Sequence, residues 1–170
     1  ALAYRAGEGF YIPVGHRGED AEPQLSLDQV MAQLAPLLAA DKPGKIGQNL
    51  KYDLSVLWAN GYQLNGIAHD TMLESYTLNS TASRHDMDSL AGFYLGRKTI
   101  HYEDVTGKGA KQIGFEQVPV AVATQYAAED AEITLALHQH LWPLLAAEAG
   151  PARIYRELEV PLVTVLARME

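Results

Sequence analysis

The chain contains no cysteine among its 170 residues. Disulfides, thiolate zinc sites and cysteine nucleophiles are therefore excluded, and any metal ligands have to come from aspartate, glutamate or histidine. No apolar run approaches the roughly 18 residues that a membrane span requires, and the first residues lack the basic and then apolar pattern of a signal peptide. We therefore expect a cytoplasmic protein without a membrane partner.

Positive charge is also scarce, because 13 Lys and Arg face 21 Asp and Glu and the formal net charge is -8. Broad binding to nucleic acid through counterion release depends on many Lys and Arg contacts and is disfavoured. A nuclease remains compatible with this charge, since an acidic cleft can meet a phosphodiester through bound cations. Hydrophobic residues make up 48% of the chain, which is enough for the core of one globular domain.

The hydrophobic pattern predicts strands that alternate with helices, and hence an α/β fold with a partly parallel sheet. Ser26 and Gln29 form a capping box that opens a helix ending near Ala40. The other expected elements are a hairpin of strands 1–5 and 10–15, strands 45–48 and 66–71, a helix through Asp53 that ends at Asn60-Gly61, and helices 72–78, 86–96 and 119–148. Breaks are expected at Gly150-Pro151 and at Pro161. Residues 97–117 have no clear period and are predicted to be a mobile basic loop.

One acid stands out early in the long C-terminal helical run. Helical spacing places Asp130 in a stripe whose other members are Tyr126, Ile133, Leu137 and Leu141. A desolvated carboxylate needs a cation, a metal or several hydrogen-bond donors. A metal held by Asp130 could carry a water that the Tyr126 hydroxyl orients, while a buried Lys or Arg partner, or a tyrosine that simply packs on the acid, stays open.

A second acid, Asp53, shares a helical face with Val56 and Leu57 and is predicted to face the core. Two core-facing acids could share one ion. Because Asp53 lies near a helix start, a role in satisfying free N-H groups remains the alternative.

The histidine patterns are weaker. His138 and His140 are two residues apart on a helix and point to different faces, so solvated surface is favoured over a zinc site. His69 and Asp70 end a predicted strand. They could act as a ligand or as an acid-base pair, but the favoured interpretation is that Asp70 caps the next helix.

Three further side chains have two interpretations each. Arg84 and His85 precede a helix start and could receive a phosphate, or could lie in a solvated loop. Tyr102 could stack on a base, or could anchor the 97–117 segment to the core.

Four blocks in order resemble the proofreading exonuclease domain of bacterial DNA polymerase I, a family A polymerase. The blocks are Gln48–Asp53, Asp70–Tyr76, Arg84–Leu90 and Tyr126–Asp130. The resemblance runs over nearly the whole chain and implies an RNase H-like fold, with a mixed sheet flanked by helices. It also implies removal of nucleotides from the 3' end of single-stranded or mispaired DNA, the editing activity of a polymerase.

The resemblance assigns a role to each matching residue. Asp53 and Asp130 match metal-binding acids of the second and third motifs, and Tyr126 matches the water-positioning tyrosine. The residues that fall where the family contacts the DNA end are Gln48, Asn49, Tyr52, Arg84, His85 and Tyr102, with Arg84 holding phosphate. The implied cofactors are two divalent cations about 4 Å apart, Mg²⁺ or Mn²⁺ with Zn²⁺ as an alternative.

The family's first motif, Asp-x-Glu at the end of an apolar strand, is expected upstream of Ala1 together with the first strand of the sheet. Asp20-Ala21-Glu22 has the letters but lies in a polar loop, and Asp130-Ala131-Glu132 lies inside a helix. We therefore expect residues 1–160 to be an N-terminally incomplete exonuclease domain. Residues 161–170 would begin the passage to the polymerase domain, the partner in the same parent chain.

Two rival functions remain. The chain could be an inactive module that binds single-stranded DNA or acts as a scaffold, because the first-motif acids are not in it. It could also resemble a related RNA exonuclease, since the motif chemistry does not select the sugar.

Overall fold

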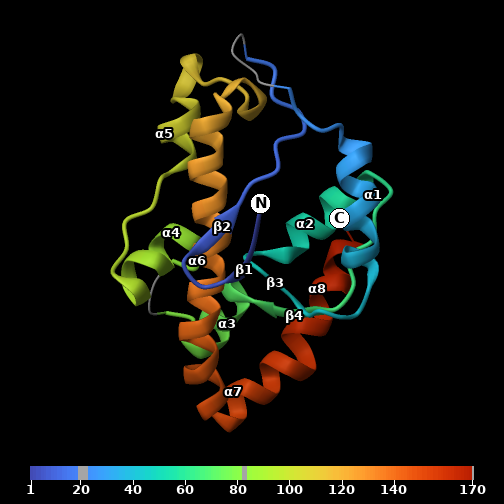
Figure 1. Cartoon of the computed structure of the whole chain (residues 1–170). Coiled ribbons are helices and arrows are strands. Elements are labelled where there is room, and N and C mark those ends of the chain that lie inside the picture. The colour runs from blue at the N-terminus through green and yellow to red at the C-terminus, as the bar shows by residue number, and fades with distance from the viewer. Residues whose placement is uncertain (19–22, 82–83, 170) are drawn as a thin grey trace.

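The computed structural model describes residues 1–18, 23–81 and 84–169, and the predicted mixed α/β class is confirmed (Figure 1). In chain order the strands and α-helices are β1 (Leu2–Arg5), β2 (Glu8–Phe10), α1 (Leu27–Ala39), β3 (Lys45–Gly47), α2 (Leu50–Ala59), β4 (Ile67–Asp70), α3 (Thr71–Leu78), α4 (Met87–Leu90), α5 (Tyr102–Thr106), α6 (Val120–Ala147), α7 (Ala149–Ile154) and α8 (Val160–Ala167). Short 3-10 or π segments are η1 (Ala91–Leu95), η2 (Gly109–Lys111), η3 (Phe115–Gln117) and η4 (Tyr155–Glu159).

The strands of the described residues form two pairs. β1 and β2 are an antiparallel hairpin, as predicted, but β2 covers Glu8–Phe10 and shares only Phe10 with the expected strand 10–15. β3 and β4 are parallel, with Gly47 opposite Asp70. The described strands are therefore arranged as one antiparallel and one parallel pair, and helices make up most of the fold.

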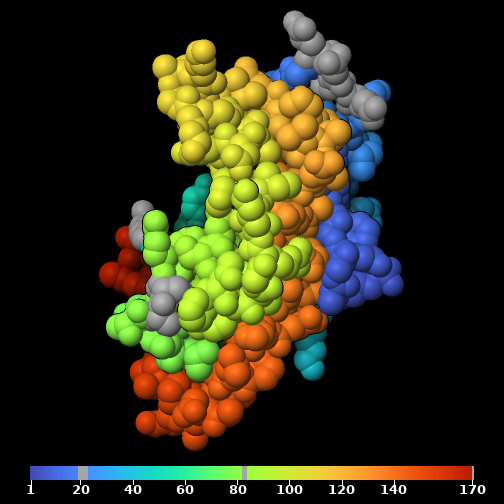
Figure 2. Space-filling view, turned by 90° about the vertical axis from the view of Figure 1, so that its left-hand side faces the viewer, coloured from blue at the N-terminus to red at the C-terminus, as the bar shows by residue number. Residues whose placement is uncertain are grey.

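Helix α6 runs along the length of the molecule, and the hairpin and α3 pack on it (Figure 1). The segment 97–117 lies beside the N-terminal part of α6 in the space-filling view (Figure 2). Three members of the predicted apolar stripe, Ile133, Leu137 and Leu141, are fully buried and form one core cluster with Leu90 and Ala91. The stripe prediction is thus confirmed.

The hairpin and α6 approach each other at backbone contact. A Cβ atom at Gly9 would lie 1.9 Å from the carbonyl oxygen of Ala128, so glycine is required at this crossing. Ala128 lies between Tyr126 and Asp130 on α6, so the close contact sets the position of the hairpin next to both side chains.

The buried carboxylate of Asp70 joins two helix starts. It accepts hydrogen bonds from the amides of Asn49 and Leu50 at the start of α2, with N···O distances of 3.1 and 2.7 Å. It also accepts from Met72 and Leu73 at the start of α3, at 3.0 and 3.3 Å. The predicted cap on α3 is confirmed, and the same side chain caps α2 as well.

A second core lies between α2 and α8, where Leu54 packs against Val163 and Ala167. Tyr155 belongs to the turn before α8, and its hydroxyl accepts the backbone amide of Asp70 at 2.9 Å. The C-terminal helices therefore contact the same residue that joins α2 and α3.

Three expectations about irregular segments are wrong. The break expected at Gly150-Pro151 falls at Glu148, and both of these residues lie inside α7. Residues 97–117 contain α5, η2 and η3, because the Asp104 carboxylate accepts the His101 amide at 3.0 Å and Tyr102 stacks on Phe115 at 6.1 Å. Pro161 does not break the chain's helical course. The π-turn η4 lets the amide of Val160 reach the Tyr155 carbonyl, five residues back, so Pro161 falls in the first turn of α8 where no amide donor is needed.

We predict that Gly9→Ala lowers the free energy of unfolding by about 1–3 kcal/mol, because the added methyl group overlaps the backbone of α6. Urea unfolding monitored by far-UV circular dichroism measures the change. Gly15→Ala is the control, since a Cβ at Gly15 meets nothing within 4 Å. Equal stability of the two variants would contradict the close approach.

We further predict that Asp70→Ala costs about 2–4 kcal/mol of stability, since two helix caps of about 1–2 kcal/mol each are lost. Ser26→Ala removes a cap from α1 alone and should cost roughly 1 kcal/mol in the same unfolding experiment. A loss at Asp70 no larger than the loss at Ser26 would show that only one helix depends on this carboxylate.

Candidate active site

Tyr126 and Asp130 lie one turn apart on α6, and the Tyr126 hydroxyl interacts with the Asp130 carboxylate. Burial raises the pKa of Asp130 to about 6, and the interaction with Tyr126 opposes that rise. Burial and the negative charge of Asp130 raise the pKa of Tyr126. The phenol is therefore protonated at neutral pH and available as a donor beside the acid.

Asp53 reaches the same region from α2, although its predicted orientation toward the core is wrong. Leu54 takes the fully buried position of this turn, and the 100° step between neighbouring helical residues leaves Asp53 on the exposed side. Desolvation nevertheless raises the pKa of Asp53. Ala1, the residue before β1, lies within electrostatic range of both Asp53 and Asp130, so the two acids face a common space at the start of β1.

The two acids fit a divalent cation. Oδ1 of Asp130 is buried and has no hydrogen-bond partner, so one ligand atom is unsatisfied by the protein. Burial makes the negative charge of Asp130 costly, as its raised pKa indicates. A cation with oxygen ligands would compensate both effects.

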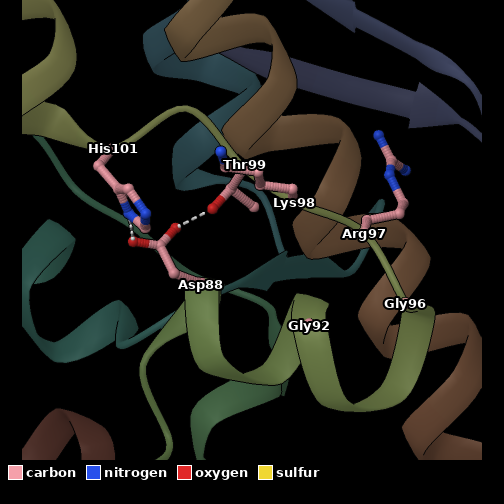
Figure 3. A pocket seen from close by; sticks show the side chains of 7 residues that line it. All are labelled: Asp88, Gly92, Gly96, Arg97, Lys98, Thr99 and His101. Carbon is pink, nitrogen blue, oxygen red and sulfur yellow. Dashed lines mark hydrogen bonds and ion pairs between the residues drawn. The ribbon is translucent and has the colours of Figure 1, made fainter.

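Asp88 is a third acid at this site, whereas from the sequence either Asp86 or Asp88 was expected to cap the helix that follows Arg84 and His85. Its charge raises the pKa of Asp130. It accepts hydrogen bonds from Thr99 Oγ1 at 2.7 Å and His101 Nδ1 at 2.6 Å, and these three side chains point toward one another (Figure 3). The cap on α4 is supplied by Asp86 instead. The position of Asp88 in the Arg84–Leu90 block was the feature of the sequence that could have assigned this acid to the site.

A shallow pocket of about 380 Å³ lies beside Asp88. Its lining residues are Asp88, Gly92, Gly96, Arg97, Lys98, Thr99 and His101 (Figure 3). Arg97 points away from the Asp88 group in this view and pairs with Glu132 of α6 at 2.6 Å. The pocket thus combines one carboxylate with the start of the basic segment.

Aromatic rings cover the Tyr126 side of the site. The ring centroids of Tyr102, Phe115 and Tyr126 lie 5.8 to 6.2 Å from one another. Tyr102 is still 44% exposed, so the structure brings it next to Tyr126 with part of its ring accessible. Sequence reasoning missed Phe115, which lies in the stretch taken as a loop.

Gln48, Asn49 and Tyr52 lie around the start of α2. The Gln48 side chain donates to the backbone carbonyl of His85 at 2.8 Å and accepts a hydrogen bond from Thr71 Oγ1. Asn49 has the left-handed backbone conformation, with φ of 60°, directly before the helix. Tyr52 is 69% exposed. Gln48 thus has structural partners, while Tyr52 presents an accessible ring.

Arg84 and His85 precede α4. The Arg84 side chain is 89% exposed and pairs with Asp86 at 3.5 Å. His85 Nδ1 is 3.0 Å from Ser75 Oγ, and its ring meets Tyr76 edge-on at 5.3 Å. Because Gln48 also contacts His85, the sequence blocks at the starts of α2 and α4 converge in space.

The two Asp-x-Glu sequences behave differently. Asp20-Ala21-Glu22 lies outside the described residues. Glu132 is buried, pairs with Arg97 and accepts the Gly7 amide at 3.3 Å, so it connects α6 to the hairpin turn. As expected, the Asp130–Glu132 sequence does not supply two acids to one site.

Comparison with known proteins gives a consistent family. The sequence profile described as 3'-5' exonuclease matches residues 2–146. DNA polymerase I of Pseudomonas aeruginosa is 51% identical over 173 residues, which covers 100% of this chain and 19% of that protein. DNA polymerase I of Rhizobium leguminosarum is 40% identical over 168 residues, covering 94% of this chain and 16% of the relative. The chain thus spans less than a fifth of the length of these relatives.

A solved structure agrees with the sequence matches. The chain resembles the structure described as the POL domain of Pol1 from M. smegmatis in complex with DNA primer-template and dNTP, with a TM-score of 0.66 and 25% identity over 85% of this chain and 22% of that one. None of the described helices is both long and apolar enough to cross a membrane. The α/β fold, the matched profile and the similar polymerases together establish that this chain belongs to the 3'-5' exonuclease domain family of DNA polymerase I.

Proposed function

We propose that this domain hydrolyses 3'-terminal nucleotides of single-stranded or mispaired DNA with the help of divalent cations, as the editing part of a DNA polymerase I. The observation that supports it most is the convergence of Asp53 and Asp130, from two helices, on one space with an unsatisfied buried Asp130 oxygen. Two carboxylates are fewer ligands than two cations need, so the proposal includes further acids from an Asp-x-Glu strand upstream of Ala1.

Asp53 and Asp130 hold Mg²⁺ or Mn²⁺, with Zn²⁺ as an alternative. Bound there, two cations stabilise the charge that develops on the entering and leaving oxygens of an in-line displacement at phosphorus. The protonated Tyr126 hydroxyl, one helical turn from Asp130, orients the attacking water.

The DNA end lies along the side chains around this site. Tyr102 and Tyr52, both exposed, offer rings for stacking on bases. Arg84, an exposed cation before α4, holds a phosphate, and Gln48, Asn49 and His85 line the same approach. These contacts are local, which agrees with the acidic net charge of the whole chain.

The polymerase domain of the same parent chain is the proposed neighbour at the C-terminal end. Residues 1–160 form the exonuclease part and residues 161–170 begin the passage. Three apolar residues of α8 remain exposed, Leu162, Val165 and Leu166, which supports a contact with further protein.

We predict that Asp130→Asn lowers metal-dependent trimming of a 3' single-stranded DNA oligonucleotide at least about 100-fold, because a cation ligand is lost. Its free energy of unfolding at neutral pH should be unchanged or slightly higher, since the ionised acid has a raised pKa and disfavours folding. The polypeptide that carries this chain with its upstream segment and the 170-residue chain alone are both assayed, by gel electrophoresis.

Asp28→Asn, on the exposed side of α1, is the control and should keep full activity. Trimming that survives Asp130→Asn would refute the ligand role. A folded but inactive longer polypeptide that still binds single-stranded DNA would support the rival function, a binding or scaffold module. Faster trimming of a matched RNA would support the RNA exonuclease.

We also predict that Tyr126→Phe lowers kcat about 10- to 100-fold while KM and stability stay close to the parent values, because water orientation is lost without loss of the ring. Single-turnover kinetics on the longer polypeptide measure the chemical step. Tyr94→Phe, a half-buried tyrosine that contacts His140 and Phe93, is the matched control. The same small effect in both variants would mean that Tyr126 only packs.

A further inference from the structure

Two histidines and a buried glutamate from three elements meet away from the site acids. Glu74 Oε1 of α3 lies 2.8 Å from Nδ1 of His138 in α6 and 2.9 Å from Nδ1 of His69 in β4. One ligand atom from each of the three residues lies within 4.8 Å of the other two. His138 follows Asp130 by eight residues, about 12 Å along the helix, so the cluster is a separate place in the fold.

The position of His138 differs from the sequence expectation. The solvated surface predicted for the histidine pair holds for His140, which is exposed. The His138 side chain is only 14% exposed, because it turns toward α3. The two residues do point to different faces of α6, as expected.

The charge of Glu74 is incompletely compensated. Its side chain has no exposed surface, and Oε2 is buried without a hydrogen-bond partner. Within the described part of the chain, its ion pairs are with His69 and His138. A buried carboxylate is costly unless it meets a cation or a full set of donors. The Glu74 carboxylate therefore keeps unused capacity to bind a cation.

Aromatic packing holds the two imidazoles in place. Their ring centroids are 4.1 Å apart, and the Trp142 ring lies 4.6 Å from His69. Tyr155 stacks on His69 at 6.1 Å and itself contacts Trp142. The rings therefore have little freedom to turn away from Glu74, so the three ligand atoms are preorganised.

We propose that His69, Glu74 and His138 bind one transition-metal ion of the Zn²⁺ class. Two imidazole nitrogens and a carboxylate suit Zn²⁺ or Co²⁺, whereas Mg²⁺ prefers oxygen ligands alone. Metal-ligand bonds of about 2.0–2.1 Å in tetrahedral geometry place ligand atoms about 3.3 Å apart, so the separations of 2.8 and 2.9 Å between Glu74 and the two histidines would widen slightly on binding. The His69 and His138 side chains are 21% and 14% exposed, so water can approach the ion as a fourth ligand.

The bound ion would join β4 and α3 to α6. His69 directly precedes Asp70, the residue that caps α2 and α3, so the ion would strengthen the frame that carries Asp53. Its role is structural and independent of the nuclease chemistry proposed for Asp53 and Asp130.

The test uses the full 170-residue chain with Asp53→Asn and Asp130→Asn, so that the site acids cannot hold the metal. The chain is treated with EDTA, dialysed and titrated with Co²⁺, whose visible absorption reports tetrahedral nitrogen and oxygen ligands, and then with Zn²⁺ by calorimetry. We expect one equivalent to bind and Tm to rise by several degrees.

His69→Gln and, separately, His138→Gln should weaken binding at least about 100-fold and abolish the Co²⁺ bands, because even changes behind the ligands cost about 10- to 100-fold. His140→Gln, two residues further along α6, is the matched control and should bind as its parent does. Circular dichroism verifies folding of each variant. Three results would overturn the metal site: unchanged binding in both ligand variants, equally weakened binding in the His140→Gln control, or no binding to the folded parent. The three side chains would then be only a hydrogen-bonded cluster.

Discussion

The carboxylate of Asp70 is the constraint on which the rest of the domain depends. It accepts four backbone amides from the starts of α2 and α3, and its own amide donates to Tyr155. A helix start leaves several N-H groups without partners, so burying two starts side by side requires one compact acceptor. Because α2 carries Asp53, this buried junction also determines where that exposed acid lies relative to α6.

Helix α6 carries the other functional side chains at successive positions along its length. Tyr126 and Asp130 lie where the hairpin crosses, and the contact of Gly9 with Ala128 sets the distance between the hairpin and the helix. Beyond this crossing Glu132 pairs with Arg97, and further on His138 meets Glu74. Successive stretches of α6 thus serve the proposed nuclease site, the hairpin and the proposed structural metal site.

The buried acids differ mainly in what compensates their charge. Asp70 has four amides and Glu132 has Arg97 and the Gly7 amide, and both are accounted for by the fold. Asp130 has a phenol and one unsatisfied oxygen, and Glu74 has two histidines and one unsatisfied oxygen. An acid that the protein leaves incompletely compensated is the one expected to meet a cation, which is why these two places, and not the other two, carry the proposals.

The sequence alone determined the features that local spacing controls. The apolar stripe of α6, the Ser26 cap, the Asp70 cap on α3 and the pairing of Tyr126 with Asp130 all depend on residues within a turn or two of one another. The resemblance to the family is also local in this sense, because four short blocks of sequence carry it.

Only the tertiary structure decided which segments meet. The orientation of Asp53 was predicted wrongly because neighbouring helical residues compete for the core. The 97–117 segment was predicted wrongly because its helices depend on contacts such as that of Tyr102 with Phe115. The position of His138 was predicted wrongly because its partners Glu74 and His69 are more than sixty residues away in the chain. Contacts over such separations leave no periodic signal, since each partner's pattern is set by its own helix or strand.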